Sequence, residues 1–122
     1  MSTTAEKTRN KTSQELEYAT FYVGDILLGV NIQQVEEINR TLNMTFVPQA
    51  PPCVRGLVNL RGEVVMVVDL RTALGLETAE ITVKSRNVIV RSGGEQIGLL
   101  VDRVADVVRA QSSDMEPPPA NV

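Results

Sequence analysis

The stretch that decides the fold is Gly56–Arg71, which reads GLVNLRGEVVMVVDLR. Two apolar runs rich in β-branched residues flank the single pair Arg61-Gly62, and the second run, 64–68, contains no polar residue. Such a run is typical of a strand with little water on either face. The sequence therefore predicts a hairpin of Leu57–Leu60 and Glu63–Leu70, with an arginine at its tip that has no obvious local partner. This arrangement indicates a β-barrel that binds proteins rather than an enzyme.

The composition supports one domain, or two small lobes that depend on each other. The 122 residues are 43% hydrophobic but include only four aromatic residues, so Val, Ile and Leu must build the core, which favours strands. The net charge is −3, and no Lys/Arg-rich stripe with interleaved aromatics is present, which argues against nucleic acid as a partner. The sequence has no apolar run of membrane-spanning length and no signal-peptide pattern, so we expect a cytoplasmic protein without membrane insertion.

The residue types that perform catalysis are poorly represented. Histidine is absent, which removes the commonest general base and metal ligand, and the single Cys53 can form neither an internal disulfide nor a metal cluster. Carboxylates are available at Glu36, Glu37, Asp69 and Asp102. A general acid–base pair also needs a cleft and shifted pKa values, so we interpret these carboxylates as solvated or structural. We expect no catalytic residue, no metal and no cofactor.

Three segments before the hairpin are predicted to lack strand structure. Residues 1–15 are polar and predict a disordered tail. Gln33–Arg40 predicts a short helix, because Val35 and Ile38 lie three apart and would share a helical face. Pro52 is tolerated at a first helical position, so residues 52–56 predict one helical turn.

Further strands are predicted from apolar runs between turn residues, at Tyr18–Val23, Ile26–Ile32, Met44–Val47, Asn87–Arg91 and Gln96–Val101. Arg71–Leu76 predicts a brief turn or helix that ends near Gly75. The polar connection Glu77–Arg86, with an extended middle at 81–83, predicts the boundary between two lobes. Val101–Val108 is ambiguous, because its valines fit a helical face while their number favours a strand.

An ordered set of short motifs from about Leu16 to Pro119 resembles the CheW family of chemotaxis coupling proteins. The most specific part is Asn-Leu-Arg-Gly at 59–62 followed by Val-Asp-Leu-Arg at 68–71. The other motifs, in chain order, are Phe21 with Gly24-Asp25 and Gly29-Val30, Val35–Ile38, Val47-Pro48 with Ala50-Pro51, Val54–Leu57, and Gly98–Val104.

The resemblance implies a mainly β protein of two SH3-like β-barrels packed side by side, about 16–80 and 81–122, and favours a strand for 101–108. It implies a non-enzymatic adaptor that couples methyl-accepting chemoreceptors to a chemotaxis histidine kinase. One barrel would pair with the similar regulatory domain of that kinase. A groove between the barrels would receive the tip of a receptor's helical hairpin.

The resemblance also assigns partner-binding roles to six residues: Val35, Glu37, Gly56, Arg61, Val104 and Val107. Arg61 resembles an arginine implicated in receptor and array contact, and Val35 and Glu37 resemble positions implicated in coupling. Gly56 resembles a glycine at which the backbone must pass closely, and the two later valines resemble positions near the receptor groove. From local pattern alone, the better interpretation of Arg61 and Glu37 is a solvated charge.

Members of this family usually continue well past the Pro-Pro segment, which lies at 117–119 in this sequence. We therefore expect an incomplete second barrel whose unpaired strand edge invites pairing with another chain, including a homodimer. Two other functions stay open. A generic SH3-like peptide-binding module is disfavoured by the few aromatics, since proline-rich ligands dock in aromatic-lined grooves. An enzyme would be favoured by an apolar-lined cleft that held Glu37 or Asp102 with a raised pKa.

Overall fold

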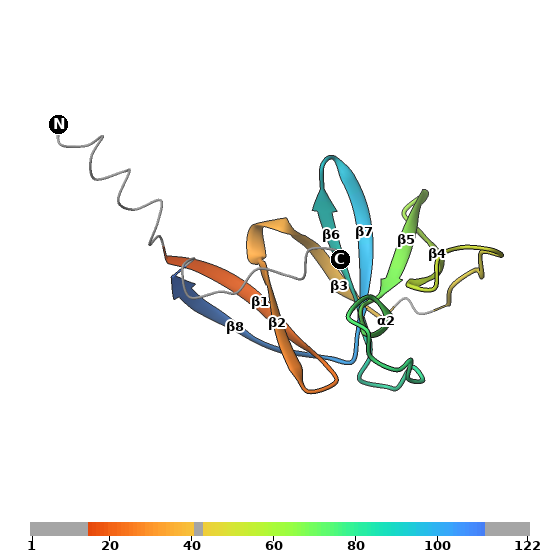
Figure 1. Cartoon of the computed structure of the whole chain (residues 1–122). Coiled ribbons are helices and arrows are strands. Elements are labelled where there is room, and N and C mark those ends of the chain that lie inside the picture. The colour runs from red at the N-terminus through yellow and green to blue at the C-terminus, as the bar shows by residue number, and fades with distance from the viewer. Residues whose placement is uncertain (1–14, 41–42, 112–122) are drawn as a thin grey trace.

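The computed structural model describes residues 15–40 and 43–111, and its strands form two sheets that meet at one corner (Figure 1). The three-stranded sheet has the order β2-β1-β8, with strands Ile26–Asn31, Glu15–Val23 and Arg103–Gln111. The five-stranded sheet has the order β3-β6-β7-β5-β4, with strands Val35–Asn39, Arg86–Ser92, Glu95–Val101, Glu63–Asp69 and Val54–Leu60. All neighbours are antiparallel except β5 and β7. The prediction of a mainly β protein is confirmed.

The predicted hairpins form where two apolar runs surround residues that accept a positive φ angle. Glycine residues with positive φ lie in the β1–β2, β4–β5 and β6–β7 turns, and Gly75 ends the short helix α2, Leu70–Ala73. Glycine lacks a Cβ and adopts this conformation at no steric cost. The prediction of a brief helix that ends near Gly75 is therefore confirmed, and so is the strand for 101–108, which lies in β8 apart from its first two residues.

The predicted helix at Gln33–Arg40 is wrong. A single 3₁₀ turn, η1 (Ile32–Gln34), leads directly into β3, which pairs with β6. Two apolar residues three positions apart are weak evidence for helical periodicity, and the ladder with β6 outweighs it. Exposure alternates along β3, as it does on a strand with one covered face.

Two other local predictions are wrong. Met44–Val47 forms no strand but one isolated bridge, in which Thr45 and Leu57 exchange two backbone hydrogen bonds of 2.8 and 2.9 Å. Residues 52–56 form no helical turn, since the Val54 N–H donates to the Pro51 carbonyl and β4 begins at Val54. Pro48, Pro51 and Pro52, which lie between or within these segments, have no N–H to donate and so limit the ladders there.

The core consists of two aliphatic clusters with one aromatic ring. The first lies where the sheets and α2 meet, and its buried members are Phe21, Val23, Leu70, Val88, Val90 and Val101. The second lies inside the curl of the five-stranded sheet, with Val58, Val65, Val67, Ile89 and Leu100. The expectation of a Val/Ile/Leu core is confirmed. Because Phe21 and Val23 come from β1, the first cluster joins one sheet to the other.

Strand pairing crosses the predicted lobe boundary near residue 80 in both sheets. β1 and β2 share a sheet with β8, and β3, β4 and β5 share one with β6 and β7. The domain bounds stay a prediction. The predicted tail, 1–15, lies outside the described residues except for Glu15, which begins β1. In the described part of the chain, no helix has the length and apolar character needed to cross a bilayer.

Candidate functional site

The tip of the β4–β5 hairpin presents the arginine that the sequence singled out. Arg61 and Gly62 both have positive φ, 52° and 85°, which is the geometry of a two-residue turn matched to the twist of its strands. The Gly62 N–H donates to Oδ1 of Asn59 at 3.0 Å and fixes the turn. A non-glycine residue in this conformation costs about 1–2 kcal/mol. The turn holds the Arg61 side chain 79% exposed.

The sequence offered no local partner for Arg61, and the partner that the structure shows comes from a distant strand. NH1 of Arg61 lies 2.5 Å from Oε1 of Glu37, which belongs to β3. β3 and β4 are the two outer strands of the five-stranded sheet, so this ion pair joins opposite edges and shows that the sheet curls into a barrel. The sequence could not reveal the pair, because it depends on how far the whole sheet curls.

Hydrogen bonds hold the carboxylate of Glu37 in its charged form. The Asn39 amide and then the Arg61 guanidinium lower the pKa of Glu37 below its usual range, against an opposing effect of burial. The neighbouring Glu36 accepts from Nε of Arg91 at 2.7 Å and from Gln96, and these contacts lower its pKa as well. The adjacent carboxylates of Glu36 and Glu37 on β3 are therefore both hydrogen-bonded to polar side chains.

Gly56 lies where a second segment crosses β4. A Cβ at this position would lie 2.7 Å from the Thr45 carbonyl oxygen and 2.9 Å from Cβ of Met44. Real Cβ atoms essentially never approach other atoms so closely. The close backbone passage that the resemblance implied is therefore present, and it allows the Thr45–Leu57 bridge to cover the outer edge of β4.

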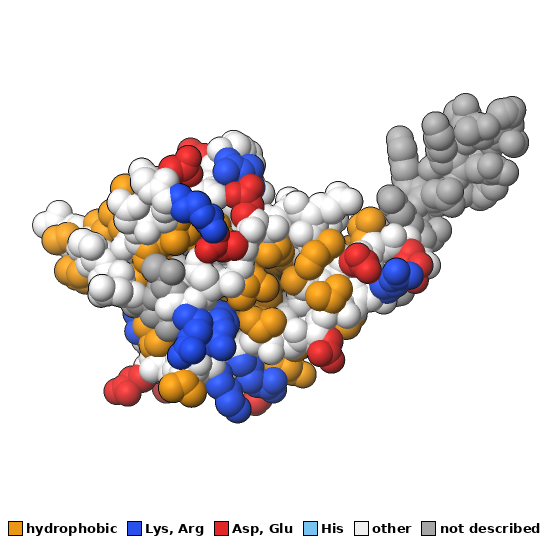
Figure 2. All heavy atoms as spheres, turned by 180° about the vertical axis from the view of Figure 1, so that it is seen from behind, with side chains coloured by type: hydrophobic (Ala, Val, Ile, Leu, Met, Phe, Trp, Pro, Cys, Tyr) orange, Lys and Arg blue, Asp and Glu red, His pale blue; other side chains and the backbone are white. Residues whose placement is uncertain are grey.

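The valine sites divide between core and surface. Val35 is half-buried and packs against the first core cluster. Val104 and Val107 lie on β8, 37% and 56% exposed. Figure 2 shows hydrophobic side chains along the arm that the three-stranded sheet forms. The structure thus brings Arg61 and Glu37 together, while the β8 valines lie on the other sheet.

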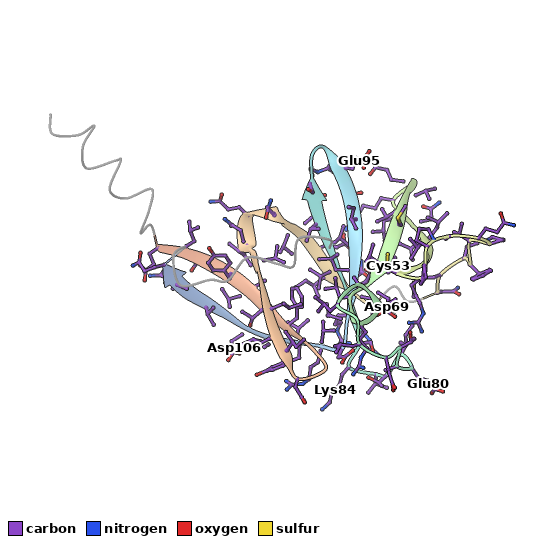
Figure 3. The ribbon with its side chains drawn as sticks, in the orientation of Figure 1. Cys53, Asp69, Glu80, Lys84, Glu95 and Asp106 are labelled. Carbon is purple, nitrogen blue, oxygen red and sulfur yellow. The ribbon has the colours of Figure 1, made fainter. Side chains whose placement is uncertain are left out.

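Two further ion pairs, which the sequence analysis did not predict, join four more charges of the motifs. NH1 of Arg55 lies 2.7 Å from Oδ2 of the buried Asp69, whose Oδ1 accepts from the Arg71 N–H and caps α2. Figure 3 shows Asp69 at the centre of the molecule beside Cys53, whose carbonyl accepts from the Asp69 N–H at 2.7 Å. The only indication of this pairing in the sequence was that Arg55 and Asp69 both belong to the ordered set of motifs.

The second pair fastens the two sheets together at their corner. Asp102, between β7 and β8, accepts from Nε and NH2 of Arg71 at 2.9–3.1 Å and from the Gly24 N–H at 2.7 Å. Burial raises the pKa of Asp102, but the hydrogen bonds from Arg71 and Gly24 outweigh it, and the pKa falls below its ordinary 3.8. Gly24 lies in the β1–β2 turn, so one carboxylate links three segments.

The ion pairs of Glu37 and Asp102 bear on the alternative that the protein is an enzyme. Glu37 and Asp102 were the candidate acids of an enzyme, and the pKa of each is lowered rather than raised. A proton donor near neutral pH needs the opposite shift. Among residues 15–40 and 43–111, no group of three or more Cys, Asp or Glu side chains could hold a metal ion.

A family model described as the CheW-like domain matches residues 17–122. The chain belongs to the CheW-like domain family. It is 39% identical to the chemotaxis protein CheW of Rhizobium meliloti over 84% of this chain and 66% of the relative, and 34% identical to CheW of Bacillus subtilis over 84% and 65%. The crystal structure of the scaffolding protein TtCheW from Thermoanaerobacter tengcongensis superposes with a TM-score of 0.79 at 31% identity, over 88% of this chain and 73% of that one.

These similarities agree with the fold class predicted from the sequence, two SH3-like barrels with short helices. The chain spans about two thirds of the length of the curated relatives it matches.

Proposed function

We propose that this protein is a non-enzymatic cytoplasmic adaptor that couples methyl-accepting chemoreceptors to a chemotaxis histidine kinase. The observation that carries the proposal is the CheW-like match over residues 17–122, together with the likeness to a solved scaffolding protein. The named relatives are chemotaxis proteins. The geometry agrees with such a role, because the candidate carboxylates Glu36, Glu37 and Asp102 each pair with an arginine.

In this proposal the Arg61–Glu37 pair is a docking point for the receptor or the kinase regulatory domain. The guanidinium is 79% exposed, so water already competes for it, and the pair contributes little to stability. A carboxylate from a partner can therefore replace or join Glu37 at small cost. Val35 lies on the same strand as Glu37 and packs on the core, so a change there would move the strand that carries the docking carboxylate.

The β8 valines supply the apolar part of the proposed coupling surface. The tip of a helical hairpin offers an apolar stripe, and such helices dock on exposed apolar side chains. Val104 and Val107 provide such side chains, 37% and 56% exposed. Gly56 acts indirectly, since it holds the Met44–Thr45 segment beside the hairpin that ends in Arg61.

Calorimetric titration of the chain with a purified kinase regulatory domain and, separately, a receptor cytoplasmic fragment tests the proposal. We expect both to bind, and Arg61→Glu to weaken at least one of them about tenfold while circular dichroism stays unchanged. Lys84→Glu is the control, because Lys84 is an exposed cation in the connection before β6 and belongs to neither proposed contact surface. The proposal is wrong for this chain if neither partner binds the unmodified protein.

A charge exchange separates docking from structure at the same site. Arg61→Glu combined with Glu37→Arg restores the ion pair but reverses the charge at the exposed position. We expect the exchanged variant to fold like the unmodified chain and still to bind poorly. Full recovery of binding would mean that the pair acts only by holding the barrel together.

A further inference from the structure

A hollow of about 240 Å³, which we call the corner pocket, lies between α2, the connection that precedes β6, and the start of β8. Its charged lining residues are Arg71, Glu80, Lys84, Asp102 and Arg103. Figure 3 shows Glu80 and Lys84 on the connection, at the base of the molecule in that view. Pockets for drug-sized ligands have about 300–1,000 Å³, so the corner pocket suits a single small group.

Two of these five charges cancel each other. Asp102 accepts hydrogen bonds from Nε and NH2 of Arg71 at 2.9–3.1 Å, so the carboxylate and this guanidinium are already paired. The other three charges are the cations Lys84 and Arg103 and the carboxylate of Glu80. None of these three side chains forms an ion pair within residues 15–40 and 43–111. The corner pocket therefore has an excess of positive charge, although the net charge of the whole chain is −3.

Tyr22 holds the guanidinium of Arg103 in place. Cζ of Arg103 lies 3.9 Å from the centroid of the Tyr22 ring, and the two residues stand opposite each other on β8 and β1. This cation–π contact uses the flat face of the guanidinium. Because the N–H donors of a guanidinium lie in its plane, they remain available at its edge, where their fork matches two oxygens of a phosphate.

A hydrogen-bonded turn fixes the backbone that carries Lys84. The Ser85 N–H donates to the Thr82 carbonyl at 3.1 Å, and the Thr82 N–H donates to Oγ of Ser85 at 2.9 Å. NH1 of Arg86 donates to the carbonyls of Val83 and Ser85 at 2.9 and 2.7 Å, and it brings a further cation to this turn. The turn therefore holds Lys84 at the corner pocket, while the lysine side chain is exposed.

We propose that the corner pocket binds a phosphate group, with Arg103 and Lys84 as the residues that hold it. A phosphate monoester carries about −1.5 to −2 charges at pH 7 and has three strong acceptor oxygens. Such a dianion gains more from two unpaired cations than a carboxylate would, and this gain offsets the repulsion from Glu80. The fork of Arg103 binds two oxygens, and the ammonium of Lys84 binds the third. The pocket includes neither the Arg61–Glu37 pair nor the β8 valines, so this site goes beyond the proposed adaptor function.

Calorimetric titration of the full chain with inorganic phosphate, at an ionic strength held constant with chloride, measures the binding. We expect saturation with a Kd of about 1 mM. Arg103→Gln should weaken binding about tenfold, because it removes a two-pronged contact, and Lys84→Gln about threefold, because an ammonium on a flexible stem is a single point charge. Arg109→Gln is the matched control and should bind like the unmodified chain, because Arg109 is an exposed arginine of β8 that does not line the pocket.

A second titration, with glycerol 3-phosphate, distinguishes the two sources of the phosphate group. Tighter binding of the ester identifies a phosphomonoester as the ligand, and equal or weaker binding identifies inorganic phosphate. Circular dichroism should show that all variants keep the fold, because the three substituted side chains are exposed. The proposal is overturned if neither compound saturates the chain by roughly 20 mM, or if Arg103→Gln and Arg109→Gln weaken binding equally. Because neither titration contains a receptor or kinase, the result is independent of the proposed adaptor function.

Discussion

Replacement of Gly56 by alanine tests the close passage between β4 and the segment before it. The added methyl group would lie 2.7 Å from the Thr45 oxygen, so the two backbones must separate by about 0.7 Å to reach an ordinary contact of 3.4 Å. That movement strains both hydrogen bonds of the Thr45–Leu57 bridge, each of which contributes about 0.5–1.5 kcal/mol. Overpacking lowers the free energy of unfolding by about 1–3 kcal/mol. Alanine also restricts the unfolded chain more than glycine does, which raises that free energy by about 0.4–1 kcal/mol.

We therefore expect Gly56→Ala to lower the free energy of unfolding by about 2 kcal/mol and Tm by roughly 8–16 °C. Urea unfolding gives the first value, and hydrogen exchange at the amides of Thr45 and Leu57 shows where the change occurs. Gly94→Ala is the comparison, since Gly94 has φ 84° and no atom near the added methyl group. It should cost about 1 kcal/mol without faster exchange at the bridge. The steric argument fails if Gly56→Ala is as stable as the unmodified chain and both amides stay protected.

Two further predictions concern the aspartates of the motif ion pairs. Because the folded-state pKa of Asp102 lies below its ordinary 3.8, its stabilisation is present above that pH and is lost as the pH falls through the folded value. Asp102→Asn weakens the bond to Arg71, so we expect it to lower the free energy of unfolding by about 1–2 kcal/mol at pH 7. Urea unfolding should show that this difference from the unmodified chain shrinks below pH 3.8. A difference that does not change with pH would contradict the prediction. Asp69→Ala removes both the α2 cap and the ion pair with Arg55, and it should lower the free energy of unfolding by about 2–3 kcal/mol in the same assay. Arg109→Ala, at an exposed ion pair, should lower it by less than about 0.5 kcal/mol. Equal losses in the two variants would show that the buried pair is no more important for stability than the exposed one.

The sequence predicted the elements whose signals are local. The hairpins around Gly24, Arg61-Gly62 and Gly93-Gly94 combine apolar runs with residues suited to positive φ, and all three form. The short helix after β5 begins at a capping carboxylate, Asp69, and ends at Gly75. Such features depend on a few neighbouring residues, so one sequence is sufficient to find them.

The features that the sequence missed depend on distant contacts. β3 is a strand because β6 lies beside it, and its own residues Val35 and Ile38 fit a helix about equally well. The partner of Arg61 follows from the curl of five strands, which no local pattern records. The pairing of β1 with β8 joins segments about 90 positions apart, and no local pattern records it.

Exposure separates three of the motif arginines, Arg55, Arg61 and Arg71, by role. The side chains of Arg55 and Arg71 are 28% and 24% exposed, and each binds an aspartate that also caps or fastens a backbone segment. Arg61 is 79% exposed and binds a carboxylate that makes no such backbone contact among the described residues.

Changes at Arg55 or Arg71 should therefore reduce coupling only as far as they unfold the protein, and a stabilising co-solvent should restore it. A change at Arg61 should reduce coupling in a protein that remains folded, and the same co-solvent should have no effect. Binding titrations of the three alanine variants, with and without sucrose, distinguish these cases. Sucrose rescue of Arg61→Ala would place all three arginines in the same structural role.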